Sequence, residues 1–302
     1  DPIARACRIV SAYHSIFPLT EEELDLLPEL IALRACTSVV QAARNQAEAG
    51  ADPYLNVSAG PATRLIASLD GLPPHRLRGS LRRACGFSVH PQQAEILDEL
   101  NTAPNRQPIV EGMEAPKQLA PIDLSVGSPL AIMTTTREAI DQAARGIAAH
   151  LRESGASIGI GRWGEPRLCY QANQFLSEEG QNRTVHLGVD LFLEPGLPVN
   201  APLPGRIHSL KDNAQPQDYG PTVILEHRLP RSGQTIFTLY GHLSRESLSR
   251  LQVGETIQAG ERIGVVGSPM ENGGWPPHLH LQLILEPPGD SGNFPGVANP
   301  TH

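Results

Sequence analysis

The feature that most constrains the fold of this chain is a short alternating run near its C-terminal end, from Pro277 to Leu285. As a β-strand, this run places leucines 279, 281, 283 and 285 on one face and His278, His280 and Gln282 on the other. The leucine face is expected to pack in a core. The opposite face then holds two imidazoles about 7 Å apart along the strand. A solvated strand edge with two unrelated histidines explains this pair equally well, so other segments must decide.

Two upstream segments supply further side chains that bind metals. Residues 186–190 carry an imidazole and a carboxylate, and residues 240–243 carry another imidazole at the end of an apolar run. Zinc binds imidazole and carboxylate readily. On a straight strand His186 and Asp190 would lie about 13 Å apart, too far to share one metal ion, and the glycine between them disfavours a helix. We therefore expect the chain to bend at Gly188, where an unusual φ costs little.

In their order along the chain, these motifs resemble those of the lysostaphin/LytM-type zinc metallopeptidases, which cut peptidoglycan cross-bridges. The motifs that carry the resemblance are His186-x-Gly188-x-Asp190, Tyr240-Gly241-His242 and His278-x-His280. The resemblance covers about residues 157–290. It implies a β core with a narrow groove along one face, and a peptide or peptidoglycan-like substrate.

The resemblance also implies roles for the side chains. It assigns His186, Asp190 and His280 to a catalytic zinc with an open fourth position, which leaves His278 and His242 unliganded. A neutral imidazole suits the removal of a proton from a zinc-activated water, whose pKa is about 7, and no H-E-x-x-H motif supplies a glutamate base. One of His278 and His242 is expected to act as the base and the other to donate a hydrogen bond to the oxyanion or leaving amine. We favour His278 as the base, although the sequence leaves this assignment open.

The sequence predicts an α+β chain in three parts. Residues 1–88 are expected to form a small helical bundle, and residues 89–156 a Pro-rich linker followed by an amphipathic helix. Residues 157–302 consist of short apolar runs between turns, typical of a mainly antiparallel β metallopeptidase domain. Thr135 is expected to cap the amphipathic helix, which should end near Gly155.

The N-terminal part carries a second resemblance. A capping box of Thr20 and Glu23 starts a helix, and Pro28 is expected to open another. The runs 13–20 and 30–34 resemble the tail of the helical lobe of aminoglycoside-phosphotransferase-like kinases, whose catalytic loop and ATP-binding lobe have no counterpart in this sequence. The composite resembles the middle of a larger fusion of kinase-like, zinc-peptidase-like and aminotransferase-like modules, and further domains of a larger chain are therefore expected.

Composition and charge limit the classes of molecule that this chain is expected to bind. The net charge is −8 and no basic patch dominates, which argues against nucleic acid and anionic membranes. We expect no apolar stretch of membrane-spanning length and no signal peptide, so a cytoplasmic location is favoured over a secreted one. The four cysteines lack metal-type pairing and are expected to be buried free thiols.

Some motifs have plainer explanations. The glycines of residues 159–164 fit G-x-G-x-x-G, but Pro166 follows almost at once, so we expect a strand and turn and no nucleotide site. His208 and His227 match no position of the family and are expected to be surface or hydrogen-bonded core residues. The loop 268–275 is expected to be mobile, with a wall of the substrate groove as the alternative.

Two functions follow for the chain. The first is a zinc-dependent metalloendopeptidase that hydrolyses peptide bonds with a metal-activated water, favoured because all five site positions are filled. The second is a non-catalytic or small-amide-hydrolysing module within a cytosolic multi-domain fusion. Metal occupancy together with an open coordination position would distinguish them.

Overall fold

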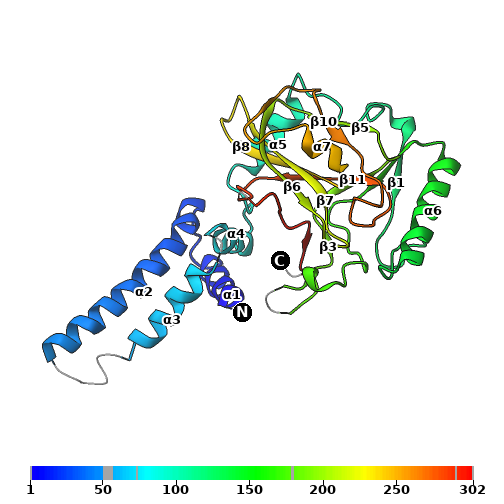
Figure 1. Ribbon diagram of the computed structural model, residues 1–302. Coiled ribbons are helices and arrows are strands. Elements are labelled where there is room, and N and C mark those ends of the chain that lie inside the picture. The colour runs from blue at the N-terminus through cyan, green and yellow to red at the C-terminus, as the bar shows by residue number, and fades with distance from the viewer. Residues whose placement is uncertain (1, 50–56, 73, 178–179, 290, 301–302) are drawn as a thin grey trace. The chain divides into compact units, whose positions relative to one another are not determined.

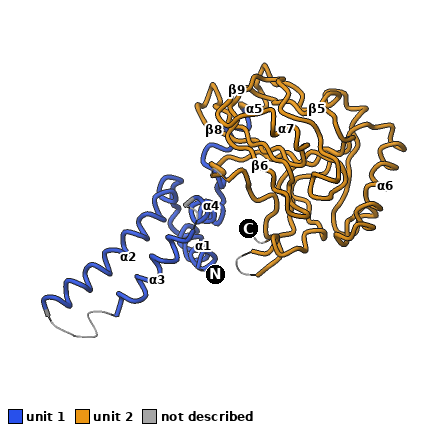
Figure 2. The backbone as a smooth tube through the Cα atoms, in the orientation of Figure 1, with its two compact units in different colours: residues 1–98 blue, residues 99–302 orange. Residues whose placement is uncertain are grey.

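The computed structural model describes residues 2–49, 57–72, 74–177, 180–289 and 291–300. The chain divides into two compact units, residues 1–98 and residues 99–302, called here the helical unit and the β unit (Figure 2). This α+β organisation, with helices first and a mainly antiparallel sheet after them, confirms the predicted fold class.

Within the described residues of the helical unit, four helices come before the helix that crosses the division at residue 98 (Figure 1). In chain order these are α1 (Pro2–His14), α2 (Glu21–Ala49), α3 (Ala59–Asp70), α4 (Pro74–Ala84) and then α5 (Gln93–Thr102). Their core is a cluster of buried aliphatic side chains from α1, α2 and α4, namely Ile3, Leu24, Leu77 and Leu81.

Helix α2 begins at the predicted capping box but continues through the proline that was expected to open a second helix. The Thr20 amide donates to Glu23, and the Glu23 amide donates to the Thr20 hydroxyl. Pro28 lies inside the helix and removes one of its hydrogen bonds. On either side of it, Asp25 and Glu29 are tied to arginines of α4, at 2.9 Å and 2.7 Å. These tertiary contacts hold α2 continuous where the local sequence favours a break.

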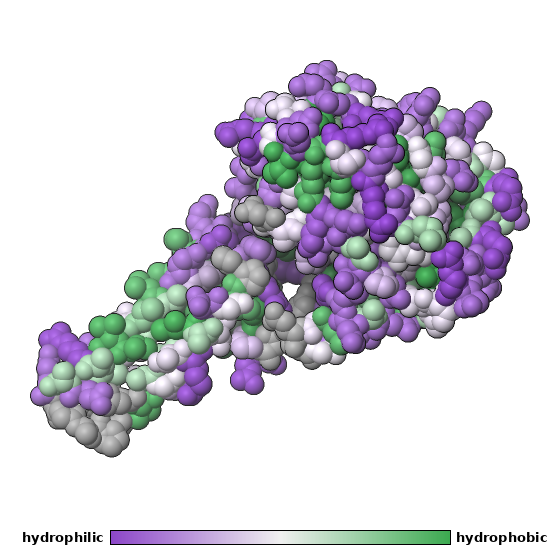
Figure 3. Space-filling model, viewed as in Figure 1, coloured by the Kyte–Doolittle hydropathy of each residue, from purple (hydrophilic) through white to green (hydrophobic). Residues whose placement is uncertain are grey.

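Helix α2 also leaves much of its apolar surface exposed. Leu26, Leu30, Leu33 and Val40 are each more than half exposed, and Figure 3 shows apolar atoms over the surface of this unit. By length and composition alone, Glu21–Glu48 is apolar enough to cross a membrane, so the expectation that no stretch reaches that length is wrong. Such a helix is weak evidence for a membrane, because core helices of soluble proteins pass the same test.

The β unit is built on an eight-stranded sheet with the strand order β1-β2-β4-β11-β8-β7-β6-β9. All neighbours are antiparallel except β1 and β2. The strands are β1 (Leu119–Ile122), β2 (Ile158–Gly161), β4 (Val189–Phe192), β6 (Gly205–Asn213), β7 (Gly220–Arg228), β8 (Thr235–Gly241), β9 (Thr256–Ile257) and β11 (His278–Ile284).

Smaller elements surround this sheet. Two strand pairs form two-stranded sheets, β5 (Pro198–Asn200) with β10 (Arg262–Val265) and β3 (Val185–His186) with β12 (Val297–Ala298). The described part of the β unit also contains α6 (Arg137–Ser154), α7 (Arg245–Ser249) and the 3-10 turns η2 (Pro116–Gln118) and η3 (Asn173–Phe175). The β3–β12 pair matters most for the site, because it fixes the backbone of His186 opposite Val297.

Strand β11, the alternating run of the sequence, lies near the middle of the sheet between β4 and β8. His280 is in register with Asp190 on one side and with Gly241 on the other. Leu279 packs in the main core as predicted. The expectation that all the leucines of this strand pack in the core is wrong at Leu283, which is 41% exposed. The histidine face is itself buried, because a central strand is covered on both sides.

Part of the predicted linker joins this sheet. Residues 119–122 form β1, which pairs with β2, and Val110 lies in the main core. Helix α6 then packs its apolar stripe against β1 and β4 through contacts that include Ile147 and Phe192. Its N-cap is Thr136, not Thr135, because the Thr136 hydroxyl accepts from the Ala139 amide. The helix ends as predicted at Gly155, in the left-handed region.

The first two glycines of the G-x-G-x-x-G match serve packing within the predicted strand, and Gly164 lies in the turn after it with a φ of 72°. A Cβ on Gly159 would lie 2.7 Å from Ile122 and 3.1 Å from Phe192, and one on Gly161 would lie 3.0 Å from the Arg167 guanidinium.

The four cysteines are free as expected. Cys169 is buried, whereas Cys36 is exposed, so the expectation of burial holds for only part of the set.

Candidate metal centre and active site

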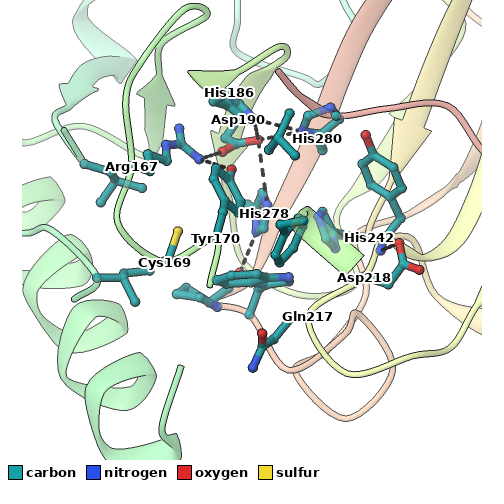
Figure 4. A pocket seen from close by; sticks show the side chains of 18 of the residues that line it. Arg167, Cys169, Tyr170, His186, Asp190, Gln217, Asp218, His242, His278 and His280 are labelled. Atoms are coloured by element: carbon teal, nitrogen blue, oxygen red, sulfur yellow. Dashed lines mark hydrogen bonds and ion pairs between the residues drawn. The ribbon is translucent and has the colours of Figure 1, made fainter. Parts of the chain in front are cut away.

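The structure brings together the five side chains that the sequence singled out (Figure 4). His278 and His280 come from β11, Asp190 from β4, His186 from β3, and His242 from the residue after β8. Each is at most 6% exposed. Strand pairing brings these five side chains together, because β11 lies between the strands that carry parts of the other two motifs.

Three of these side chains form a compact donor set. The Asp190 Oδ1 atom lies 3.2 Å from His186 Nε2 and 3.2 Å from His280 Nδ1, and the two nitrogens lie 3.0 Å apart. In a tetrahedral zinc site with bonds of about 2.0–2.1 Å, ligand atoms are about 3.3 Å apart. The triangle therefore has the size that such an ion requires. Among the described residues, this is the group of histidine, cysteine and acidic side chains that could hold a metal ion.

The outer ring nitrogens fix the tautomers of both imidazoles in this set. His186 Nδ1 lies 3.1 Å from the carbonyl oxygen of Arg162, which can only accept, so this nitrogen carries the hydrogen. The Gln282 amide donates to the Pro295 carbonyl, which turns its Oε1 toward His280 Nε2 at 3.2 Å. The two inner nitrogens thus present lone pairs to each other and to a carboxylate oxygen, an arrangement that a bound cation stabilises.

Gly188 allows this close approach, though not by the means the sequence suggested. The chain does bend there, but its φ is not in the left-handed region. A Cβ at this position would lie 2.5 Å from His280 Nε2 and 2.9 Å from the Leu281 carbonyl oxygen. The glycine is therefore required for space, since any side chain would collide with the His280 ring.

His278 and His242 lie beside the donor set. The His278 Nδ1 atom donates to the Pro276 carbonyl at 2.7 Å, and His242 Nδ1 donates to the Asn272 carbonyl at 2.8 Å. The Nε2 atoms of both rings are therefore unprotonated when the rings are neutral. His278 Nε2 lies 3.7 Å from Asp190 Oδ1. The ring centroids of His242 and His278 are 4.2 Å apart. Both rings line one pocket with the three donors.

Burial keeps these imidazoles neutral. Desolvation lowers the pKa of His278 to about 4, against the opposing effect of the Asp190 carboxylate. Desolvation and the neighbouring His278 hold the pKa of His242 well below its ordinary value. At Asp190, burial raises the pKa, but His186 and Arg167 outweigh it and hold the pKa well below the usual range. The site at neutral pH therefore combines the Asp190 carboxylate with neutral imidazoles at His278 and His242.

His242 is held in a strained backbone conformation, with a φ of 63°. Its amide donates to the Tyr219 carbonyl, and its own carbonyl accepts from Gly267, both at 2.8 Å. Such φ values are uncommon for residues other than glycine and concentrate at functional sites. The two hydrogen bonds fix the direction in which this ring enters the pocket.

Sequence reasoning missed several groups that line or support the site. The polar ones are Arg167, Tyr170, Gln217, Asp218 and Tyr219, all of which line the pocket. The Tyr219 hydroxyl and Gln217 Oε1 are buried and have no hydrogen-bond partner among the described residues. No spacing rule connects these positions with the histidines, so only the folded chain could show them.

The loop before β11, residues 268–275, contributes side chains and a backbone carbonyl to the site. Asn272 is fully buried and its carbonyl accepts from His242, while its side chain donates to the Trp275 carbonyl at 3.2 Å. Trp275 is 7% exposed, lines the pocket and packs with Tyr170 at a ring distance of 6.4 Å. This loop forms a wall of the pocket, which was the alternative interpretation. His227 is a hydrogen-bonded core residue, as expected.

Comparison with known families agrees with this geometry. Residues 184–289 match the family model described as Peptidase family M23. This segment, called here the M23 segment, therefore resembles the M23 peptidases in sequence. The M23 segment contains all five clustered residues, which confirms the family resemblance inferred from the three motifs. No curated protein matches the chain. The resemblance of the N-terminal part to a kinase lobe stays a prediction.

Solved structures similar to this chain include other peptidases. The catalytic domain of the antimicrobial peptidase lysostaphin from Staphylococcus simulans is 24% identical, with 47% of this chain and 88% of that one covered and a TM-score of 0.29. The catalytic domain of the prophage-encoded M23 protein EnpA from Enterococcus faecalis is 23% identical, with coverages of 42% and 85% and a TM-score of 0.30.

A zinc containing peptidase from Vibrio cholerae is 21% identical, with 36% of this chain covered and a TM-score of 0.28. The alignment spans 30% of the length of that peptidase.

Proposed function

We propose that the M23 segment is a zinc-dependent metalloendopeptidase that hydrolyses peptide bonds of peptidoglycan-type or Gly-rich peptides by a metal-activated water. The observation that carries this proposal is the triangle of inward lone pairs on His186, Asp190 and His280. Zinc held there would polarise a scissile carbonyl and lower the pKa of a water to about 7.

The two remaining histidines supply the proton chemistry. His278 is neutral at pH 7, its Nε2 atom is unprotonated, and it lies next to the carboxylate of the donor set. It is therefore the proton acceptor in this proposal. His242 has the same tautomer, so it donates toward the pocket only after its Nε2 atom has gained a proton. Because His242 is neutral at rest, that proton would be the one that His278 takes from the water, and His242 is assigned to the oxyanion or leaving amine in the resulting protonated form.

The walls of the pocket favour a short substrate. Aromatic side chains close around the site, and two of them, Tyr170 and Phe175, come from a segment outside the M23 match. With the five central side chains at most 6% exposed, a short peptide or small amide reaches them more easily than a cross-linked polymer does. This observation supports small-amide hydrolysis as the second function.

The test combines metal content with cleavage. Purified chain, His186→Ala and Asp190→Ala are compared for zinc stoichiometry and for cleavage of a Gly-rich peptide, a cross-linked stem peptide and a short acylated amide. His75→Ala, at an exposed position of the helical unit, is the matched control.

We expect one zinc per chain and cleavage in the unmodified protein and in the control, with loss of both in the two site variants. Cleavage of the short amide alone would favour the second function. A chain that binds no zinc after metal supplementation would refute the proposal.

A further inference from the structure

The segment that precedes the M23 match builds a second layer around the donor set. Residues 164–167 run antiparallel to the strand that carries His186. The Gly164 amide donates to the His186 carbonyl at 2.8 Å, the His186 amide donates to the Glu165 carbonyl at 3.0 Å, and the Arg167 amide donates to the Thr184 carbonyl at 2.8 Å. His186 is thus held between this segment and β12.

This pairing places the side chains of Glu165 and Arg167, two residues apart, on the same side of the chain. Arg167 Nη1 donates to Asp190 Oδ2 at 2.6 Å, and Arg167 Nε donates to Glu165 Oε2 at 2.8 Å. The other Glu165 oxygen accepts from the Leu124 amide at 3.1 Å. Glu165 and Arg167 are 3% and 4% exposed, so the pair is an internal feature of the fold.

The two oxygens of Asp190 therefore have separate partners. Oδ2 is occupied by the guanidinium of Arg167, while Oδ1 alone faces the imidazoles of His186 and His280. A carboxylate without such a partner is free to rotate about its last bond and to offer both oxygens to a metal ion. The absence of a side chain at Gly161 leaves the room that the guanidinium occupies.

We propose that Arg167, held by Glu165, is a positioning residue that makes Asp190 a metal ligand through one oxygen and so keeps the fourth coordination position open. The inference rests on the proposed function, because it concerns the metal of that site. It adds two residues that lie outside the M23 match, and the contact that carries their effect on the metal is the one from Arg167 to Asp190.

Charge alone leads to the opposite expectation, which makes the proposal testable. Glu165 and Arg167 carry opposite charges, so the pair adds no net charge near the donor set. Arg167→Gln removes a cation and leaves Glu165 as an extra anion, which by charge alone tightens the binding of a divalent cation. The double variant Glu165→Gln/Arg167→Gln changes no net charge, and because the removed cation lies nearer to Asp190 than the removed anion, charge alone predicts at most slightly tighter binding. Loss of positioning weakens binding in both variants.

The experiment measures zinc affinity of the full chain by competition with a chromophoric chelator, for the unmodified protein, Arg167→Gln and the double variant. Arg206→Gln is the matched control, because Arg206 forms a surface pair with Glu226 at 3.0 Å, outside the site. Thermal unfolding of the metal-free proteins is recorded alongside. Visible absorption of the cobalt-substituted proteins reports the coordination number.

We expect both site variants to bind zinc about 10–100-fold more weakly, the range for partners that orient metal ligands. Their cobalt spectra should shift from the intense bands of a four-coordinate ion to the weaker bands of a five-coordinate one. The control should match the unmodified protein in both measurements. The double variant removes the buried Glu165 carboxylate together with Arg167, so it leaves one fewer unpaired buried charge than Arg167→Gln and keeps the test open if that variant does not fold.

Other outcomes overturn the inference in separable ways. Tighter zinc binding by Arg167→Gln, with unchanged or slightly tighter binding by the double variant, would show that the pair acts through charge. Unchanged zinc affinity and cobalt spectra, with lower unfolding temperatures, would show that it only stabilises the fold. Either result leaves the proposed function standing if the unmodified chain binds zinc and cleaves peptide. An unmodified chain without a zinc site would refute the proposed function itself.

Discussion

Substitution of Gly188 by alanine tests whether the donor set depends on space at this bend. A Cβ placed there would lie 2.5 Å from His280 Nε2, and also within close contact of His280 Cε1. Ordinary contact begins near 3.4 Å, so the ring must move by about 1 Å or the backbone must yield. The backbone has little freedom, because the Leu281 carbonyl lies 2.9 Å from the same point and belongs to the central strand.

A shift of this size is large for a metal ligand, because bond lengths in such sites are held within about 0.2 Å. We expect Gly188→Ala to weaken zinc binding by at least about 10-fold and to lower kcat/KM by about 100-fold, the cost of a 1 Å misplacement at a reacting centre. Overpacking should also reduce the free energy of unfolding by about 1–3 kcal/mol. Chelator competition, peptide cleavage and chemical denaturation measure the three effects.

The matched control is Gly60→Ala in α3, where a Cβ meets nothing closer than 3.5 Å. Alanine inside a helix is more favourable than glycine by about 0.5–1 kcal/mol, so this variant should be slightly more stable and fully active. If Gly188→Ala binds zinc and cleaves peptide as the unmodified chain does, the steric account of the bend is wrong.

Three further predictions follow from the site. His278→Gln and His242→Gln should each retain stoichiometric zinc while kcat falls by about 10²–10⁴-fold, and loss of zinc in either would mean that it serves as a ligand. In the metal-free protein, His278 has a folded pKa of about 4 against about 6.5 when unfolded, so the unfolded state binds more protons between these values. The contribution of His278 to the free energy of unfolding, on the order of 3 kcal/mol, should be present above pH 6.5 and lost as the pH falls toward 4. Denaturation curves of His278→Gln, recorded as a function of pH, should lack this part of the pH dependence. Trp275→Ala removes a pocket wall and should raise KM more than it lowers kcat in steady-state assays, an expectation that an unchanged KM would contradict.

The central strand shows how much local pattern can reveal. Alternation from Pro277 to Leu285 is enough to predict a strand, because side chains of a strand point to opposite faces in turn. It does not reveal what lies on each face. Leu283 is exposed although its pattern matches that of Leu279, since burial depends on which elements cover the sheet at each position.

The ends of helices and strands are harder to predict from local sequence, as α2 and β1 show. Pro28 marks a helix start by local preference, yet α2 runs through it because arginines of α4 hold the residues on both sides. Similarly, the prolines after residue 103 predict a linker, but residues 119–122 gain hydrogen bonds from β2 and become a strand. In both cases contacts between segments distant in sequence outweigh a local preference of a few kcal/mol.

The sequence by itself determined the fold class, the strand that carries His278 and His280, and the motifs that supply the other three members of the cluster. These depend on the periodicity of the chain and on the chemistry of imidazole and carboxylate, both of which are local. Only the tertiary structure decided the direction of each ring nitrogen and the partners of Asp190. Those partners include Arg167, 23 residues before it, and His280, 90 residues after it. Hydrogen bonds that fix tautomers and orient ligands come from backbone carbonyls and buried side chains, whose positions exist only once the sheet has formed.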